Sequence, residues 1–104
     1  MQARWKASRD WEGFAGVLHG GIISTLLDEA MAKAVLAGRH RAMTCELKVR
    51  YRHYVATGEE LVIRGWISEV KKRKILTEAS VSTEAGEERA HGWGVFLTVG
   101  KPGE

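Results

Sequence analysis

Residues 16–38 read GVLHGGIISTLLDEAMAKAVLAG, a glycine-rich turn that leads into a regular amphipathic pattern. From Ile22 to Val35 the apolar residues recur with the three-to-four spacing of one buried helix face. Gly38 follows this pattern and is a typical residue at which a helix ends. We therefore predict one long helix that begins near Gly20 and ends near Gly38.

Asp28 lies within this predicted helix, beside its apolar face. At about 100° of rotation per residue, Asp28 falls next to Ser24 and Val35, at the edge of the apolar arc. The neighbouring Glu29 precedes Lys33 by four positions, so these two side chains can form an ion pair on the outer face. The pattern therefore places the Asp28 carboxylate at the border between core and solvent.

After the helix the hydrophobic period changes to two. Between Cys45 and Arg52, apolar residues alternate with charged ones, which predicts a half-buried strand. Cys45 is expected to be a small core residue rather than a nucleophile. The same reasoning predicts four other strands, at residues 2–7, 61–68, 75–83 and 90–99. Turns are predicted at residues 56–58, 71–74 and 84–87.

The predicted element order is a short strand, one long helix and four strands joined by hairpin-length turns. Short turns between consecutive strands imply antiparallel pairing. We therefore predict an α+β fold in which a curved, antiparallel, five-stranded sheet wraps around the helix. The chain of 104 residues is expected to form one domain, residues 1–104. A core this small and unpaired sheet edges favour a homo-oligomer.

Composition narrows the class of protein. The chain has 44% hydrophobic and 28% charged residues and a formal net charge of +3, as ordinary globular proteins do. Its one cysteine excludes an intrachain disulfide and favours a reducing compartment. The apolar stretch at residues 22–36 is too charged to span a bilayer, and the first residues lack the apolar run of a signal peptide. We therefore expect a cytoplasmic protein without membrane contact.

The glycine turn ahead of the helix has the parts of a site for acyl-transfer chemistry. Gly20 and Gly21 let a ligand approach the backbone, and the first N–H groups of a helix can hold an anion or a developing oxyanion. A nearby carboxylate such as Asp28 can act as a base or a nucleophile. On spacing alone, this pattern more often indicates a glycine turn that leads into a helix with a surface aspartate than it indicates an active site.

The run from His19 to Met31 resembles the signature of the hotdog thioesterases of the PaaI-like group. That signature is His-Gly-Gly, a hydrophobic helix, and an aspartate nine residues after the histidine, which is the spacing of His19 and Asp28. Residues 44–51, 58–61, 90–92 and 95–96 also resemble strands and a turn of that family. The resemblance implies a hotdog fold and an acyl-CoA thioesterase that works as a homodimer or a dimer of dimers, without a cofactor.

The resemblance also implies roles for particular residues. The N–H of Gly20 would bind the carbonyl oxygen of the thioester. Asp28, from the other subunit of a dimer, would activate water or attack the carbonyl carbon directly. Thr44 falls where related enzymes carry a serine or threonine that helps to position the water. His19 would fix the turn and hydrogen-bond near the thioester.

Gly21 and three basic residues, Arg50, Arg73 and Lys74, are predicted to bind the substrate. The basic side chains would meet the phosphates of coenzyme A. The basic run at residues 71–74 is also typical of a solvated hairpin tip that binds nothing.

The remaining candidates have structural explanations. His53 and His91 have no second ligand at metal spacing, so they are expected to be structural or surface residues, and no metal is predicted. The four tryptophans are expected in the core or at an interface; they are Trp5, Trp11, Trp66 and Trp93. The tail at residues 100–104 is expected to be loose.

Three other functions remain open. A non-catalytic acyl-CoA-binding or regulatory hotdog domain would keep the glycine turn but would not need Asp28. A hydratase or dehydratase would need a histidine and an acid arranged across the substrate, a signature that is not seen here. A nucleic-acid-binding module is suggested only by the pI of about 9.2, and the basic residues lack an aromatic stacking motif. We therefore expect hydrolysis of an acyl-CoA and no nucleic-acid partner.

Overall fold

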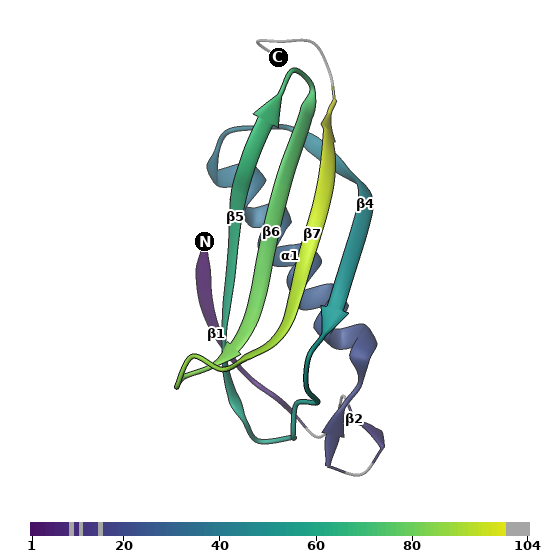
Figure 1. The fold of residues 1–104 in the computed structure, drawn as a ribbon, viewed down its shortest axis with the longest axis vertical. Coiled ribbons are helices and arrows are strands. Elements are labelled where there is room, and N and C mark those ends of the chain that lie inside the picture. Colours follow the sequence, from purple (N-terminus) through teal and green to yellow (C-terminus); the bar gives the residue numbers. More distant parts are fainter. Residues whose placement is uncertain (9, 11, 15, 100–104) are drawn as a thin grey trace.

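Five strands form a single antiparallel sheet, and one helix lies across one of its faces (Figure 1). The structure is a computed structural model that describes residues 1–8, 10, 12–14 and 16–99. The strand order is β1-β5-β6-β7-β4, and a two-stranded hairpin, β2-β3, precedes the helix. Within these residues, no helix has the length and apolar character needed to cross a membrane. The elements are β1 (Gln2–Lys6), β2 (Glu12–Phe14), β3 (Val17–Leu18), α1 (Gly20–Ala37), β4 (Ala42–Tyr51), β5 (Glu60–Lys71), β6 (Lys74–Thr83) and β7 (Glu88–Thr98).

The predicted α+β fold is confirmed, because the long helix and the five strands of the sheet are all present. α1 begins at Gly20 and ends at Ala37, one residue before the predicted stop at Gly38. The ion pair between Glu29 and Lys33 also forms, with 3.3 Å between Oε1 and Nζ. The β2-β3 hairpin has no counterpart among the predicted elements, because strands this short cannot show a hydrophobic period.

The core lies between α1 and the inner face of the sheet, and glycines on the strands let the two come close. A Cβ atom at Gly65 would lie 2.3 Å from the carbonyl oxygen of Ala30, and one at Gly94 would lie 2.9 Å from Sδ of Met31. Because real Cβ atoms do not approach other atoms so closely, any side chain at Gly65 must displace the helix backbone. Around these contacts lie the largest fully buried side chains, which include Leu27, Leu61, Ile75, Val81 and Phe96.

β4 is an edge strand, and its burial differs from the prediction. The pairing of β4 with β7 shifts between Thr44 and Glu46, so Cys45 is the extra residue of a β-bulge. Cys45 is exposed, and the prediction that it is a core residue is wrong. Leu47 and Tyr51 are 40% and 51% exposed, because none of the described elements lies beyond β4 at this edge. This part of the helix-facing surface is therefore open to a partner.

The tryptophans are divided between the core and the surface. Trp5 packs against the core from β1, whereas Trp66 and Trp93 are exposed. Two further predictions, for Trp11 and for the tail at residues 100–104, lie outside the described residues.

Candidate active site beside the edge strand

The first turn of α1 is capped by His19. The N–H of Gly21 donates to Nδ1 of His19 at 2.9 Å, and the N–H of Ile22 donates to the His19 carbonyl at 3.1 Å. Because Nδ1 accepts this bond, the neutral ring carries its proton on Nε2. The N–H of Gly20 has no acceptor in the part of the chain that the structure describes. Of the first three N–H groups of the helix, it is therefore the one that remains for a ligand.

Arg89 holds the loop on which this turn rests. The N–H of Leu18 donates to the Val55 carbonyl at 2.8 Å, which joins the segment before α1 to the loop after β4. The Arg89 guanidinium donates to the Tyr54 carbonyl at 3.0 Å and to the Glu59 carboxylate at 2.8 Å. Arg89 thus ties β7 to the loop that supports the turn. No sequence pattern identified this residue, because both partners lie at least 30 residues away in the chain.

Asp28 is joined to the edge strand through Thr44. Oγ1 of Thr44 donates to Oδ1 of Asp28 at 3.1 Å, and both side chains are partly buried. The other carboxylate oxygen, Oδ2, makes no hydrogen bond to any of the described residues and can bind water or a substrate atom. The fold thus brings two of the predicted site residues together from α1 and β4.

Tyr51 joins the end of β4 to the start of α1. Its hydroxyl donates to the Gly20 carbonyl at 2.9 Å and also hydrogen-bonds to the hydroxyl of Ser24. A Cβ atom at Gly20 would lie 3.7 Å from the Tyr51 ring, so the ring packs directly against this glycine. Sequence reasoning placed Tyr51 on a strand but found no site role for it. Only the course of β4 across the sheet brings it to the helix N-terminus.

A single chain keeps the other predicted site residues apart. Gly20 and Asp28 lie eight residues apart on one helix, which corresponds to roughly 12 Å. Arg73 and Lys74 lie at the β5–β6 hairpin, whereas Gly20 begins α1. The β5–β6 hairpin and the start of α1 lie at opposite ends of the sheet (Figure 1). Gly21 is exposed at the turn, where a Cβ atom added to it would lie 3.0 Å from Nδ1 of His19. Within one chain these groups therefore do not converge on a single site.

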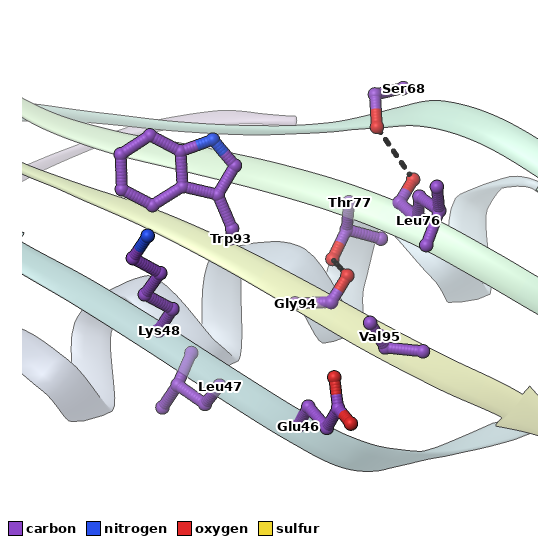
Figure 2. A pocket seen from close by; sticks show the side chains of 9 residues that line it. All are labelled: Glu46, Leu47, Lys48, Ser68, Leu76, Thr77, Trp93, Gly94 and Val95. Carbon is purple, nitrogen blue, oxygen red and sulfur yellow. Dashed lines mark hydrogen bonds between the residues drawn. The ribbon is translucent and has the colours of Figure 1, made fainter.

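A trough of about 400 Å³ lies on the outer face of the sheet, with the helix behind it (Figure 2). Lys48 Nζ lies 5.5 Å from the centre of the Trp93 ring there. Arg50 lies on this outer face too, because it pairs with His91 across the sheet. None of the predicted catalytic residues lines the trough, whose lining consists of Glu46, Leu47, Lys48, Ser68, Leu76, Thr77, Trp93, Gly94 and Val95.

His91 is held by two carboxylates on the outer face. Its Nε2 lies 2.9 Å from Oε1 of Glu78, and its Nδ1 contacts Oε1 of Glu88. Both ring nitrogens are occupied, so the contacts of His91 are structural. Among the residues that are described, no three His, Cys, Asp or Glu side chains gather as metal ligands.

Comparison with known proteins shows which protein family this chain matches. A family model described as the thioesterase superfamily matches residues 15–90, a range that contains the glycine turn, Asp28 and Thr44. An uncharacterized mitochondrial protein of Candida albicans (strain WO-1) is 29% identical over 70 residues, which make up 65% of this chain and 31% of that protein. The chain thus spans about a third of the length of this curated relative.

Several solved structures share the fold. A thioesterase superfamily protein has a TM-score of 0.89 at 28% identity, over 92% of this chain and 47% of that one. A Bacillus halodurans protein solved with CoA has a TM-score of 0.82 at 31% identity, over 92% of this chain and 69% of that one. A hypothetical thioesterase from Streptococcus pneumoniae, solved with coenzyme A, has a TM-score of 0.91 at 16% identity, over 96% and 78% of the chains. This last likeness shows the fold alone.

The family match and the structural matches agree on the same part of the molecule. The family model includes the capped turn at His19 and the Asp28–Thr44 pair, and the solved structures share the arrangement of one helix on a five-stranded sheet. The chain therefore has the hotdog fold and belongs to the thioesterase superfamily.

Proposed function

We propose that this protein hydrolyses an acyl-CoA thioester to a free acid and coenzyme A. The observation that carries the proposal is the Asp28 carboxylate, which is anchored by Thr44 through one oxygen and lies beside an open edge strand. Such a carboxylate can take a proton from water or attack a carbonyl carbon. The N–H of Gly20, at the positive end of the helix dipole, is the complementary group for the carbonyl oxygen.

In the proposed hydrolysis, the Gly20 N–H and the Asp28 carboxylate each have one role. The thioester oxygen accepts a hydrogen bond from the Gly20 N–H, which stabilises the negative charge that develops there. Asp28 takes a proton from water while the water oxygen bonds to the carbonyl carbon. The C–S bond then breaks, and the departing thiolate receives the proton from Asp28. In the other route the Asp28 carboxylate forms the bond to the carbonyl carbon and the C–S bond breaks to release the coenzyme A thiolate; water then hydrolyses the resulting anhydride, which gives the free acid, restores the Asp28 carboxylate and leaves a proton for the thiolate.

Two solved structures with this fold support the ligand and the residue pair. The structure from Bacillus halodurans was determined with CoA. The Streptococcus pneumoniae protein was also solved with an alanine in place of an aspartate and, separately, of a threonine, and these two positions are 16 residues apart. Asp28 and Thr44 are likewise 16 residues apart and hydrogen-bonded to each other. This agreement favours the Asp28–Thr44 pair as the reactive centre.

The site that we propose is completed by a second copy of the chain. If two β4 strands pair antiparallel, the Tyr51 end of one strand lies against the Thr44 end of the other. Because Tyr51 contacts Gly20 and Thr44 contacts Asp28, this pairing brings the oxyanion donor of one subunit towards the carboxylate of its partner. The exposed edge of β4, with its unpaired backbone groups, is the surface available for such pairing.

The same arrangement supplies positive charge for coenzyme A. Arg73 lies at the Ala42 end of β4, because its carbonyl accepts a hydrogen bond from Thr98, which pairs with Ala42. Antiparallel pairing therefore carries the β5–β6 hairpin of one subunit to the Gly20 end of the other. The exposed side chains of Arg73 and Lys74 can then bind the phosphates of the substrate.

The charges on β4 favour one register for this dimer. If the two-fold axis passes through Leu47, the Leu47 side chains of the two subunits contact each other on the helix-facing side of the sheet. Glu46 then faces Lys48 of the partner subunit on the outer face, where these residues pair with Val95 and Trp93 of β7 (Figure 2). Two symmetric pairs of opposite charge thus flank one apolar contact. An axis at Lys48 would instead place two like charges together.

We expect light scattering to show at least a dimer at micromolar concentration. Lys48→Glu should weaken the dimer about tenfold, because it sets two carboxylates opposite each other on both sides of the axis. The double variant Glu46→Lys with Lys48→Glu restores opposite charges and should restore the affinity. A monomeric wild type, or a Lys48→Glu variant that dimerises as tightly as the wild type, would contradict the β4 interface.

The activity itself is tested with a panel of acyl-CoA esters and a reagent that detects the free thiol. The wild-type protein should release coenzyme A from at least one ester at a rate far above the uncatalysed rate. Calorimetry with the same esters measures how tightly each one binds, independently of its hydrolysis. If one ester binds tightly and none is hydrolysed, the chain is a non-catalytic acyl-CoA-binding domain instead.

A further inference from the structure

The hydroxyl of Tyr51 is the central member of a short hydrogen-bond chain at the start of α1. It donates to the Gly20 carbonyl at 2.9 Å and contacts the Ser24 hydroxyl. A carbonyl oxygen can only accept, so the single proton of Tyr51 is committed to Gly20, and Ser24 must donate to Tyr51. The order of donation is therefore Ser24 to Tyr51 to Gly20, which links β4 to the first residue of the helix.

The Leu18–Val55 bond supports the segment before α1, but the first turn of the helix itself has few other contacts that hold it in place. It begins with two glycines, which have the greatest backbone freedom of all residues, and it has no acidic side chain in its first turn. His19 caps the turn from within the same segment, so its bond to Gly21 orders the turn without fixing it against the sheet. Tyr51 is the side chain that attaches Gly20 to a strand of the sheet.

We propose that Tyr51 is a positioning residue that holds the Gly20 N–H where the thioester oxygen develops its charge. This inference rests on the proposed thioester hydrolysis and assigns Tyr51 no direct contact with the reacting atoms. A donor displaced by a fraction of an ångström stabilises an oxyanion less well, so loss of the anchor lowers the rate of the chemical step. Binding of the substrate, which depends on other contacts, is largely retained.

A purely structural role would have different consequences. Tyr51 is 51% exposed at the end of an edge strand and is not part of the buried core. Removal of its hydroxyl leaves the ring against Gly20 and leaves the core unchanged. The thermal stability of the whole protein should therefore hardly change, while the first turn of α1 opens more often.

The test is Tyr51→Phe, with kinetics and amide hydrogen exchange measured on the same protein. We expect kcat to fall about tenfold with KM within twofold of wild type, as the loss of one hydrogen bond that orders the donor would cause. The amides of Gly21 and Ile22 should exchange about tenfold faster. Amides in the middle of the helix, such as that of Met31, should exchange at the wild-type rate.

Two variants serve as controls. Tyr54→Phe removes the hydroxyl of the other tyrosine, whose side chain is also exposed. This hydroxyl makes no hydrogen bond within the described part of the chain, and the bond from Arg89 to the Tyr54 backbone carbonyl is kept, so the variant should match wild type in both measurements. Ser24→Ala removes the donor to Tyr51 and keeps the bond to Gly20, so its effect should be less than threefold.

Each outcome decides for or against the role of Tyr51. If the wild type is active and Tyr51→Phe retains its kcat, the positioning role is wrong, although the proposed function stands. If exchange accelerates along the whole helix together with a large loss of thermal stability, Tyr51 is structural and the proposal is overturned. If the wild type hydrolyses no acyl-CoA, the proposed function fails, and exchange alone then decides: faster exchange confined to Gly21 and Ile22 supports the anchor, and unchanged exchange refutes it.

Discussion

Asp28→Asn is expected to lower kcat for acyl-CoA hydrolysis by about a hundredfold or more and to leave KM largely unchanged, because the general base or nucleophile is lost. Asparagine has nearly the same shape, and its amide oxygen can still accept the 3.1 Å hydrogen bond from Thr44. The substitution therefore removes the negative charge and the capacity to take a proton while it preserves the anchor. Steady-state kinetics with a free-thiol readout measure the effect.

Glu29→Gln is the matched control for this experiment. Glu29 follows Asp28 on the same helix, but its carboxylate is exposed and is paired with Lys33. The control loses the same charge and should keep wild-type kcat, because an exposed ion pair contributes little to stability or chemistry. If Asp28→Asn retains nearly native activity, or if both variants lose activity equally, Asp28 is not the reactive carboxylate.

Gly65→Ala is expected to destabilise the protein by about 3 kcal/mol, at the upper end of the cost of overpacking a core. The added Cβ would lie 2.3 Å from the carbonyl oxygen and 2.6 Å from the carbonyl carbon of Ala30, and both of these Ala30 atoms belong to the helix backbone. A side chain could rotate away, but the helix must move as a whole or separate from β5. Denaturant unfolding measures the change, and the shifted helix should also reduce activity.

Gly86→Ala separates this clash from the general effect of replacing a glycine. Gly86 lies in the turn between β6 and β7, has a φ of 93° and has nothing within 4 Å of an added Cβ. Its replacement costs only the strain of a left-handed backbone, on the order of 1 kcal/mol. If Gly65→Ala destabilises the protein no more than Gly86→Ala does, α1 is not packed on β5 as closely as the structure shows.

The sequence by itself determined the elements of this fold and indicated which residues to consider for its candidate site. The helical period, the glycines at both ends of α1 and the period of two in the later strands are all local features, so they could be read without a structure. The resemblance around His19 and Asp28 indicated the family before any contact was known. The predictions of the helix and the strands succeeded because neighbours in the chain decide hydrogen bonding within a helix and side-chain alternation along a strand.

The tertiary structure decided which residues meet. Cys45 and Leu47 fit the pattern of a buried strand, but β4 lies at the edge of the sheet and contains a bulge, so both are exposed. The bond between Thr44 and Asp28, the bond from Tyr51 to Gly20 and the bonds from Arg89 to Tyr54 and Glu59 join residues 16 to 35 positions apart. Such contacts depend on which strands pair, in what register, and which strand is left at the edge. The strand pairing and its register minimise the free energy of the whole folded chain, and no local hydrophobic period in the sequence encodes them.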